Sequence, residues 1–175
     1  MLGLYVAVQR MAVSLGRVME LKREAVTVHQ AVNPQPIPDG PGELRLEALS
    51  FAHEGRQGAV LNNVQVSIPG GLKVAISGAS GVGKSTLIDL LQRFYDPDAG
   101  RILLDGVDLR DLDLAALRRR IAVVSQDIVL FRGTLAQNLA YGVPEASRDE
   151  LERVVRLARL DSLVDSLPLG LDGLL

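Results

Sequence analysis

The sequence contains no cysteine, so the 175-residue chain forms no disulfide bonds and offers no thiolate ligands to a metal. It has only two histidines, His29 and His53, and they stand too far apart to indicate a zinc site. With 19 basic and 21 acidic residues the formal net charge is −2, which gives no overall basic field. Because the nucleic-acid backbone requires such a field, we expect no nucleic-acid partner.

The sequence also lacks a long hydrophobic run. Met1 to Val8 is apolar, but Gln9 and Arg10 end it well short of the roughly 20 residues that a membrane-spanning helix needs. No cationic stretch precedes it, so we predict neither a signal peptide nor a complete membrane span. Hydrophobic residues at 47% against 23% charged residues predict one folded domain with a tail.

An amphipathic helix is predicted near the beginning of the chain, from Leu4 to Val26, where apolar residues recur every three or four positions with a gap at Lys22. It could dock on a partner or a membrane surface, or it could cover the core of its own domain, and periodicity leaves both open. Asn33 to Gly42 follows with four prolines and two glycines, which predicts a semi-rigid linker.

Beyond the linker, alternating apolar residues predict paired antiparallel strands at Leu44 to Phe51 and Val60 to Ile68. Leu72 to Ser77 is a short apolar run typical of a buried strand, and Lys84 to Phe94 has helical spacing. The order is therefore strand, glycine-rich loop, helix.

The rest of the chain continues the alternation of strands and helices. Asp105-Gly106 reads as a turn rather than the end of a magnesium-binding strand, because no acidic residue follows Asp105. Ser147 is placed to cap a helix through its hydroxyl. The predicted strands are Ile102 to Leu104 and Ile121 to Ser125, and the predicted helices are Leu114 to Arg120, Thr134 to Ala140 and Arg148 to Leu160.

A phosphate-binding motif lies between the predicted buried strand and its helix. It reads Gly78-Ala79-Ser80-Gly81-Val82-Gly83-Lys84-Ser85 and fits the P-loop pattern G-x-x-x-x-G-K-[ST]. Its glycines let backbone N–H groups point at phosphate oxygens, and the helix adds the positive end of its dipole. Lys84 would reach the β- and γ-phosphates, Ser85 would bind Mg²⁺ and Thr86 could contact the α-phosphate. The alternative is a glycine turn with an incidental lysine.

The segments that flank this loop resemble the ATP-binding domain of ABC transporters, exporter type. Those around the loop are Leu49-Ser50-Phe51, Val60-Leu61, Ile68-Pro69-Gly70-Gly71 and Tyr95-Asp96-Pro97. Those after it are Gly100 to Gly106, Leu117-Arg118, Val124-Ser125-Gln126-Asp127, Leu130-Phe131-Arg132-Gly133-Thr134, Asn138 and Gly142. The resemblance covers Gly42 to the end of the chain. It implies an α/β P-loop NTPase core with an antiparallel β subdomain, and ATP with Mg²⁺ as ligands.

The resemblance also implies roles for single residues. Gln126 matches the glutamine that helps to hold Mg²⁺ and water and senses the transmembrane domain, and a polar strand end is the alternative. His53 falls where the family usually has an aromatic residue on adenine, so we expect a tentative adenine contact. An exposed loop histidine remains equally open. Asp127 to Thr134 would lie near the surface that receives the transmembrane domain.

By the same resemblance, residues 1–32 look like the cytoplasmic end of a last transmembrane helix, 33–42 the linker, and 43–175 the first part of the ATP-binding domain. The implied partners are an exporter's transmembrane domain and a second nucleotide-binding domain, at the cytoplasmic face of the cell membrane. The family's signature motif, Walker B strand, catalytic glutamate and switch histidine are not found in the sequence. We therefore expect an incomplete domain, an internal segment or a split-gene product, of marginal stability.

Three functions follow as hypotheses. The first is ATP binding within an exporter ATPase that couples ATP binding and hydrolysis to transport. The second is a nucleotide-binding or interaction fragment that does not hydrolyse ATP, because no catalytic set is complete in this chain. The third is a small-molecule kinase, for which Arg118 to Arg120 would supply cations, although a solvated helix face is the preferred interpretation of that run.

Overall fold

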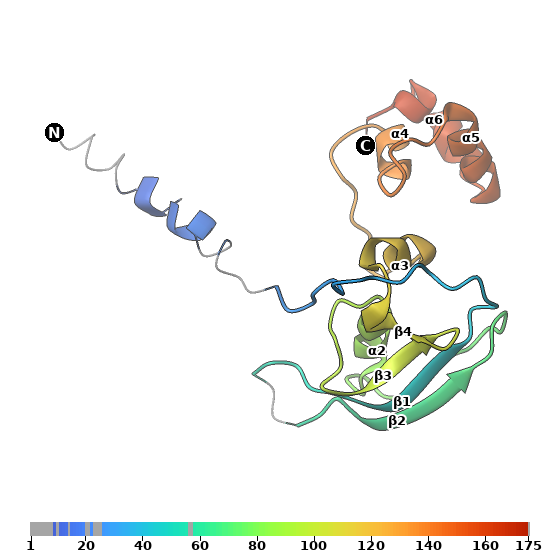
Figure 1. Ribbon diagram of the computed structural model, residues 1–175. Helices are drawn as coiled ribbons and strands as arrows, with labels where there is room; N and C mark the ends of the chain where they lie inside the picture. The colour runs from blue at the N-terminus through green and yellow to red at the C-terminus, as the bar shows by residue number, and fades with distance from the viewer. Residues whose placement is uncertain are drawn as a thin grey trace. The chain divides into compact units, whose positions relative to one another are not determined.

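The structure is a computed structural model that describes Gln9, residues 11–13, 15–19, Lys22, 26–55 and 58–174. The chain divides into two compact units, Met1–Ile121 and Ala122–Leu175 (Figure 1). The described residues between Gln9 and Lys22 are helical and exposed, and most other positions of the predicted amphipathic helix lie outside the described residues. In the described part of the chain, no helix has the length and apolar character required to cross a bilayer.

A four-stranded antiparallel sheet forms the base of the first unit. Its strands are β1 (Leu44–Phe51), β2 (Leu61–Ile68), β3 (Ala99–Leu104) and β4 (Val107–Asp108), in the order β2-β1-β3-β4 (Figure 1). The strands predicted at 44–51, 60–68 and 102–104 are therefore confirmed. Asp105 and Gly106 join β3 to β4 with φ values of 47° and 85°, as a two-residue hairpin with two left-handed residues requires.

Between Leu44 and Ile121, which the structure describes except for residues 56 and 57, three helical segments accompany the sheet. They are α2 (Lys84–Leu91), the 3₁₀ turn η1 (Leu109–Asp111) and α3 (Leu114–Arg120), of which α3 is capped by the Asp113 carboxylate. Helix α2 is shorter than the predicted Lys84 to Phe94. The buried core joins these helices to the sheet and consists of Leu46, Leu49, Phe51, Leu61, Leu90, Ile102, Leu109, Leu112 and Leu117.

Two predicted strands are wrong for this structure. Leu72 to Ser77 and Ile121 to Ser125 do not form strands, and their side chains are exposed apart from the half-buried Ile121. A parallel strand is stable when neighbours pair with its backbone and layers cover both faces. Among the described residues neither segment is paired in a sheet, so Leu72 stays 63% exposed and Val124 99% exposed.

The second unit is a small helical cluster. It contains α4 (Leu135–Leu139), α5 (Arg148–Leu157), α6 (Asp161–Ser166) and the 3₁₀ turn η2 (Gly170–Asp172), packed around Leu135, Leu151, Val155 and Leu171. The predicted cap is confirmed, because the Ser147 hydroxyl accepts from the Glu150 N–H and the Glu150 carboxylate accepts in return. Helix α5 ends three residues earlier than predicted, close to Arg159, whose φ is 58°.

Shortening a core side chain should make the first unit unfold at a lower denaturant concentration. Leu49 is fully buried, so Leu49→Ala leaves a cavity, and we expect it to lower the free energy of unfolding by about 2–5 kcal/mol in urea titrations. Leu72→Ala is the matched control, because its side chain is already largely in solvent. An unchanged urea midpoint for Leu49→Ala would contradict the core described here.

Candidate functional site

The P-loop turns through three glycines into α2. Gly78, Gly81 and Gly83 have φ values of 153°, 80° and 101°, a region of the backbone map that residues with a Cβ rarely enter. Gly83 is also crowded, since a Cβ there would lie 2.8 Å from Val60 Cγ1. The pattern of glycines that the sequence shows is therefore required by the path of this loop.

The Lys84 ammonium lies against the loop that precedes it. Its Nζ donates to the carbonyl oxygens of Gly78 at 2.9 Å and Ala79 at 2.7 Å. Ala79, Ser80 and Val82 on the loop are exposed, and so is Ser85 beside Lys84. The charge is thereby held on an open loop whose backbone an incoming anion can reach.

The N-terminus of α2 is suited to an anion. No side chain caps it and its first turn has no acidic residue, whereas side chains cap α3, α4 and α5. The first N–H groups of a helix lack internal partners and carry the positive end of its dipole. Together with the Lys84 ammonium they form an electropositive site, which fits a polyphosphate group in charge and chemistry.

His53 is joined to the same helix. Its Nε2 lies 3.0 Å from Oγ1 of Thr86, which is 7% exposed, and its ring meets Phe51 and Tyr95 edge-on at centroid distances of 4.9 and 5.4 Å. The imidazole is half-buried, so the interpretation as an exposed loop histidine is wrong. The adenine contact itself stays a prediction.

One residue that holds this corner, Asp98, was missed from the sequence. The Asp98 carboxylate accepts from the Ala52 N–H at 2.7 Å, and the Asp98 N–H donates to the Ser50 carbonyl at 3.0 Å. These bonds fix the backbone just before His53. A carboxylate next to a proline and a glycine, as in Pro97-Asp98-Ala99-Gly100, is the one sequence signal that could have suggested this anchoring.

Gln126 belongs to the second unit, where it is exposed. The predicted magnesium ligands, Ser85 and Gln126, thus belong to different units, and within the first unit the structure brings together the P-loop, Thr86 and His53. Among the described residues, no group of three or more histidine, aspartate or glutamate side chains is arranged to hold a metal ion. Magnesium binding stays a prediction.

The segment after Gln126 is ordered by one amide. Asn138 accepts from the Phe131 N–H at 2.8 Å and donates to the Phe131 carbonyl at 2.9 Å, and the Phe131 ring stacks on Tyr141 at 4.1 Å. Even so, Ile128, Val129 and Leu130 are between 64% and 80% exposed. The second unit therefore presents an apolar surface on this segment.

Comparisons with known proteins agree with the P-loop. A protein-family model described as ABC transporter matches residues 61–170. The chain is 39% identical over 170 residues to the mitochondrial iron-sulfur clusters transporter ATM1 of Candida glabrata, and the aligned region covers 96% of this chain and 23% of that protein. It is 48% identical over 135 residues to the ATP-dependent lipid A-core flippase of Thiobacillus denitrificans, and the aligned region covers 77% of this chain and 23% of that protein.

A solved structure is similar as well. It is described as a bacterial Atm1-family ABC exporter with ATP bound and matches with a TM-score of 0.83 and 32% sequence identity, over 97% of this chain and 30% of that chain. The chain thus spans about a quarter to a third of the length of these proteins.

The backbone at Gly83 provides a direct test of the loop geometry. Gly83→Ala should lower the free energy of unfolding by at least about 1–2 kcal/mol, because an L-residue is strained at this φ and its Cβ would overlap Val60. Gly142→Ala is the control, since its Cβ would meet nothing within 4 Å and its φ is not positive. Equal urea midpoints for the two variants would show that the left-handed turn is not needed.

Proposed function

The chain belongs to the ABC transporter family, and from this premise we propose that it binds Mg-ATP through the P-loop as part of the ATPase of an exporter. The observation that carries the proposal is the uncapped, electropositive start of α2 beside the Lys84 ammonium. Such a start is suited to a triphosphate, whose charge is concentrated on the β- and γ-groups. Family membership does not favour the small-molecule kinase.

Each residue at the start of α2 takes one part in binding. Lys84 leaves the carbonyl oxygens of Gly78 and Ala79 and neutralises the β- and γ-phosphates. The Ser85 hydroxyl, which is exposed next to it, is a ligand for Mg²⁺, and the bound ion offsets phosphate charge. Thr86 turns its hydroxyl from His53 to the α-phosphate, so binding exchanges one hydrogen bond for another.

The proposed partners follow from the relatives. Two of these relatives are named as a transporter and a flippase. A protein of Mycobacterium bovis that is 40% identical to the chain is named as a fatty acid ABC transporter ATP-binding/permease protein. We infer a transmembrane domain as partner, docked on the apolar surface at Ile128, Val129 and Leu130, and a second nucleotide-binding domain. With these proposed contacts the chain would lie at the cytoplasmic face of a membrane, and Gln126 would lie next to the docked domain.

The second candidate is a fragment that binds nucleotide without hydrolysing it. Hydrolysis requires an oriented water and charge stabilisation in addition to a phosphate cradle. Measuring phosphate release from Mg-ATP by the purified chain distinguishes the hydrolysing ATPase from the fragment that only binds nucleotide. Turnover that disappears in Lys84→Ala would exclude the second candidate, and binding without turnover would favour it.

Removing the Lys84 charge should abolish nucleotide binding. At Mg-ATP one hundredfold above its dissociation constant the parent chain gains about 2.7 kcal/mol of stability, visible as a raised melting temperature, whereas Lys84→Ala should gain almost none. Lys73→Ala is the control, because it removes an exposed lysine of the same charge outside the P-loop motif. A cooperative transition at high temperature without ligand would contradict the expected marginal stability, and an equal Mg-ATP shift in Lys84→Ala would contradict the proposed site.

The adenine contact of His53 can be separated from phosphate binding. His53→Ala should weaken Mg-ATP binding about fivefold, because the ring contact with the base is lost. It should not weaken the binding of inorganic tripolyphosphate, which has no base and for which Thr86 no longer has to give up its bond to His53. His29→Ala, which keeps its backbone carbonyl, is the control. Titration calorimetry measures both ligands, and an equal loss for both would assign His53 to ordering of the P-loop helix instead.

A further inference from the structure

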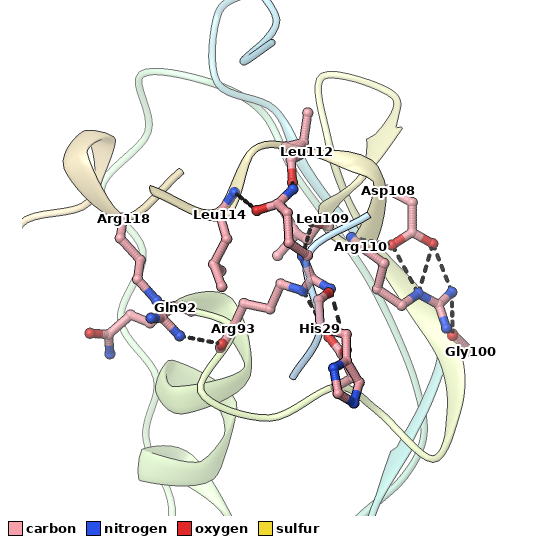
Figure 2. A network of polar contacts seen from close by, with 12 residues as sticks. His29, Gln92, Arg93, Gly100, Asp108, Leu109, Arg110, Leu112, Leu114 and Arg118 are labelled. Atoms are coloured by element: carbon pink, nitrogen blue, oxygen red, sulfur yellow. Dashed lines mark hydrogen bonds and ion pairs between the residues drawn. The ribbon is translucent and has the colours of Figure 1, made fainter. Parts of the chain in front are cut away.

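The guanidinium of Arg93 lies buried where three segments meet. The side chain is 3% exposed, and its Nε donates to Asp96 Oδ1 at 2.9 Å. Its two terminal nitrogens donate to backbone carbonyls, that of Leu109 at 3.3 Å and that of His29 at 2.8 Å (Figure 2). A buried charge persists only when it is paired and its donors are satisfied, and here both conditions hold.

The backbone of Arg93 is fixed to the end of α2. Gln92 caps the helix, and Arg93 follows with a left-handed φ of 55°. Arg118 on α3 donates to the Arg93 carbonyl at 2.9 Å and to the Gln92 carbonyl at 3.4 Å, while its guanidinium lies 5.2 Å from the centre of the Phe94 ring. Arg118 is exposed, as expected for the solvated helix face predicted at Arg118 to Arg120. Its guanidinium also places a positive charge at the C-terminal end of α2, where it satisfies free carbonyl groups.

Residues 29–35, which we call the connecting segment, lie against the run from Leu109 to Leu114. The Gln30 amide donates to the Leu112 carbonyl at 3.1 Å and accepts from the Leu114 N–H at 2.8 Å. The Gln35 N–H donates to the Asp111 carbonyl at 2.7 Å, and its carbonyl accepts from the Asp113 N–H at 2.9 Å.

Polar contacts hold this segment, because its largest aliphatic side chain, Val32, is 94% exposed. Arg93 supplies the contact at the segment's first residue, His29, and it does so from the end of α2. A planar guanidinium can serve Asp96, Leu109 and His29 together, whereas an ammonium on a lysine stem cannot reach all three.

We propose that Arg93 is a positioning residue that locks the connecting segment to the C-terminal end of α2. Helix α2 runs about 12 Å from the P-loop to Gln92, at 1.5 Å per residue, and moves as a rigid rod. Movement of its N-terminus when nucleotide binds therefore reaches the connecting segment through Arg93. This second step rests on the proposed function, and the locking itself does not.

The absence of cysteine allows a clean measurement of the locking. Val32→Cys places a single fluorophore on the connecting segment of the full chain, and the fluorescence anisotropy decay reports local motion. Arg93→Lys should increase the amplitude of the fast decay about twofold, since the bonds to Leu109 and His29 cannot both persist. Arg110→Lys is the matched control, because the Arg110 guanidinium pairs with Asp108 at 2.7 Å and donates to the Gly100 carbonyl at 3.3 Å, both outside residues 29–35.

A second variant keeps the test decisive if Arg93→Lys disturbs folding, which far-UV circular dichroism would reveal. Gln30→Ala removes two bonds of the connecting segment without touching the buried charge, and it should also raise the fast amplitude. An unchanged decay in Gln30→Ala and in a folded Arg93→Lys would overturn the locking.

The nucleotide-linked step is tested with the same label. Saturating Mg-ATP, with binding followed separately by calorimetry, should change the decay in the chain with native Arg93. In Arg93→Lys that change should fall about threefold while the dissociation constant stays within about twofold. Binding without any label response would overturn the transmission and leave the proposed function standing. Absence of binding would overturn both, and the nucleotide-free decay would still decide the locking.

Discussion

Burial of one face of α2 against the antiparallel sheet is the interaction on which the rest of the first unit depends. Leu90 on α2 and Leu49 on β1 are almost completely buried in one core. Because the helix has only eight residues, fixing this face also fixes both of its ends. One end presents Lys84 and the P-loop backbone, and the other presents Arg93. Apolar packing in the middle of the helix thus supports polar tasks at its two termini.

Charged side chains then attach the loops to this core. The Asp105 carboxylate accepts from the N–H groups of Gly42 and Glu43, the Asp98 carboxylate accepts from Ala52, and Arg93 donates to His29. In each pair the partners are between 46 and 64 residues apart in the sequence. Each side chain forms hydrogen bonds with backbone groups that have no partner in a sheet or helix. These bonds attach long connections to a small core.

The features predictable from the sequence are those with a local cause. Three features depend on neighbouring residues and are predictable from the sequence: the hairpin at Asp105-Gly106, the cap at Ser147 and the P-loop. The strands predicted at Leu72 to Ser77 and Ile121 to Ser125 depend instead on partners elsewhere, so an apolar run was not sufficient to form them. The anchoring by Arg93 and the bond between His53 and Thr86 join distant segments, and one sequence without an alignment carries no signal for such pairs.

The exposed run at Leu72 to Ser77 has a consequence for the chain in solution. Leu72, Val74 and Ile76 are between 43% and 63% exposed, on a stretch with strand-forming residues and backbone groups that no sheet serves. Such a stretch is a template for intermolecular pairing, and a net charge of only −2 opposes it weakly. The same few residues that lead into the P-loop therefore favour self-association that would grow with protein concentration.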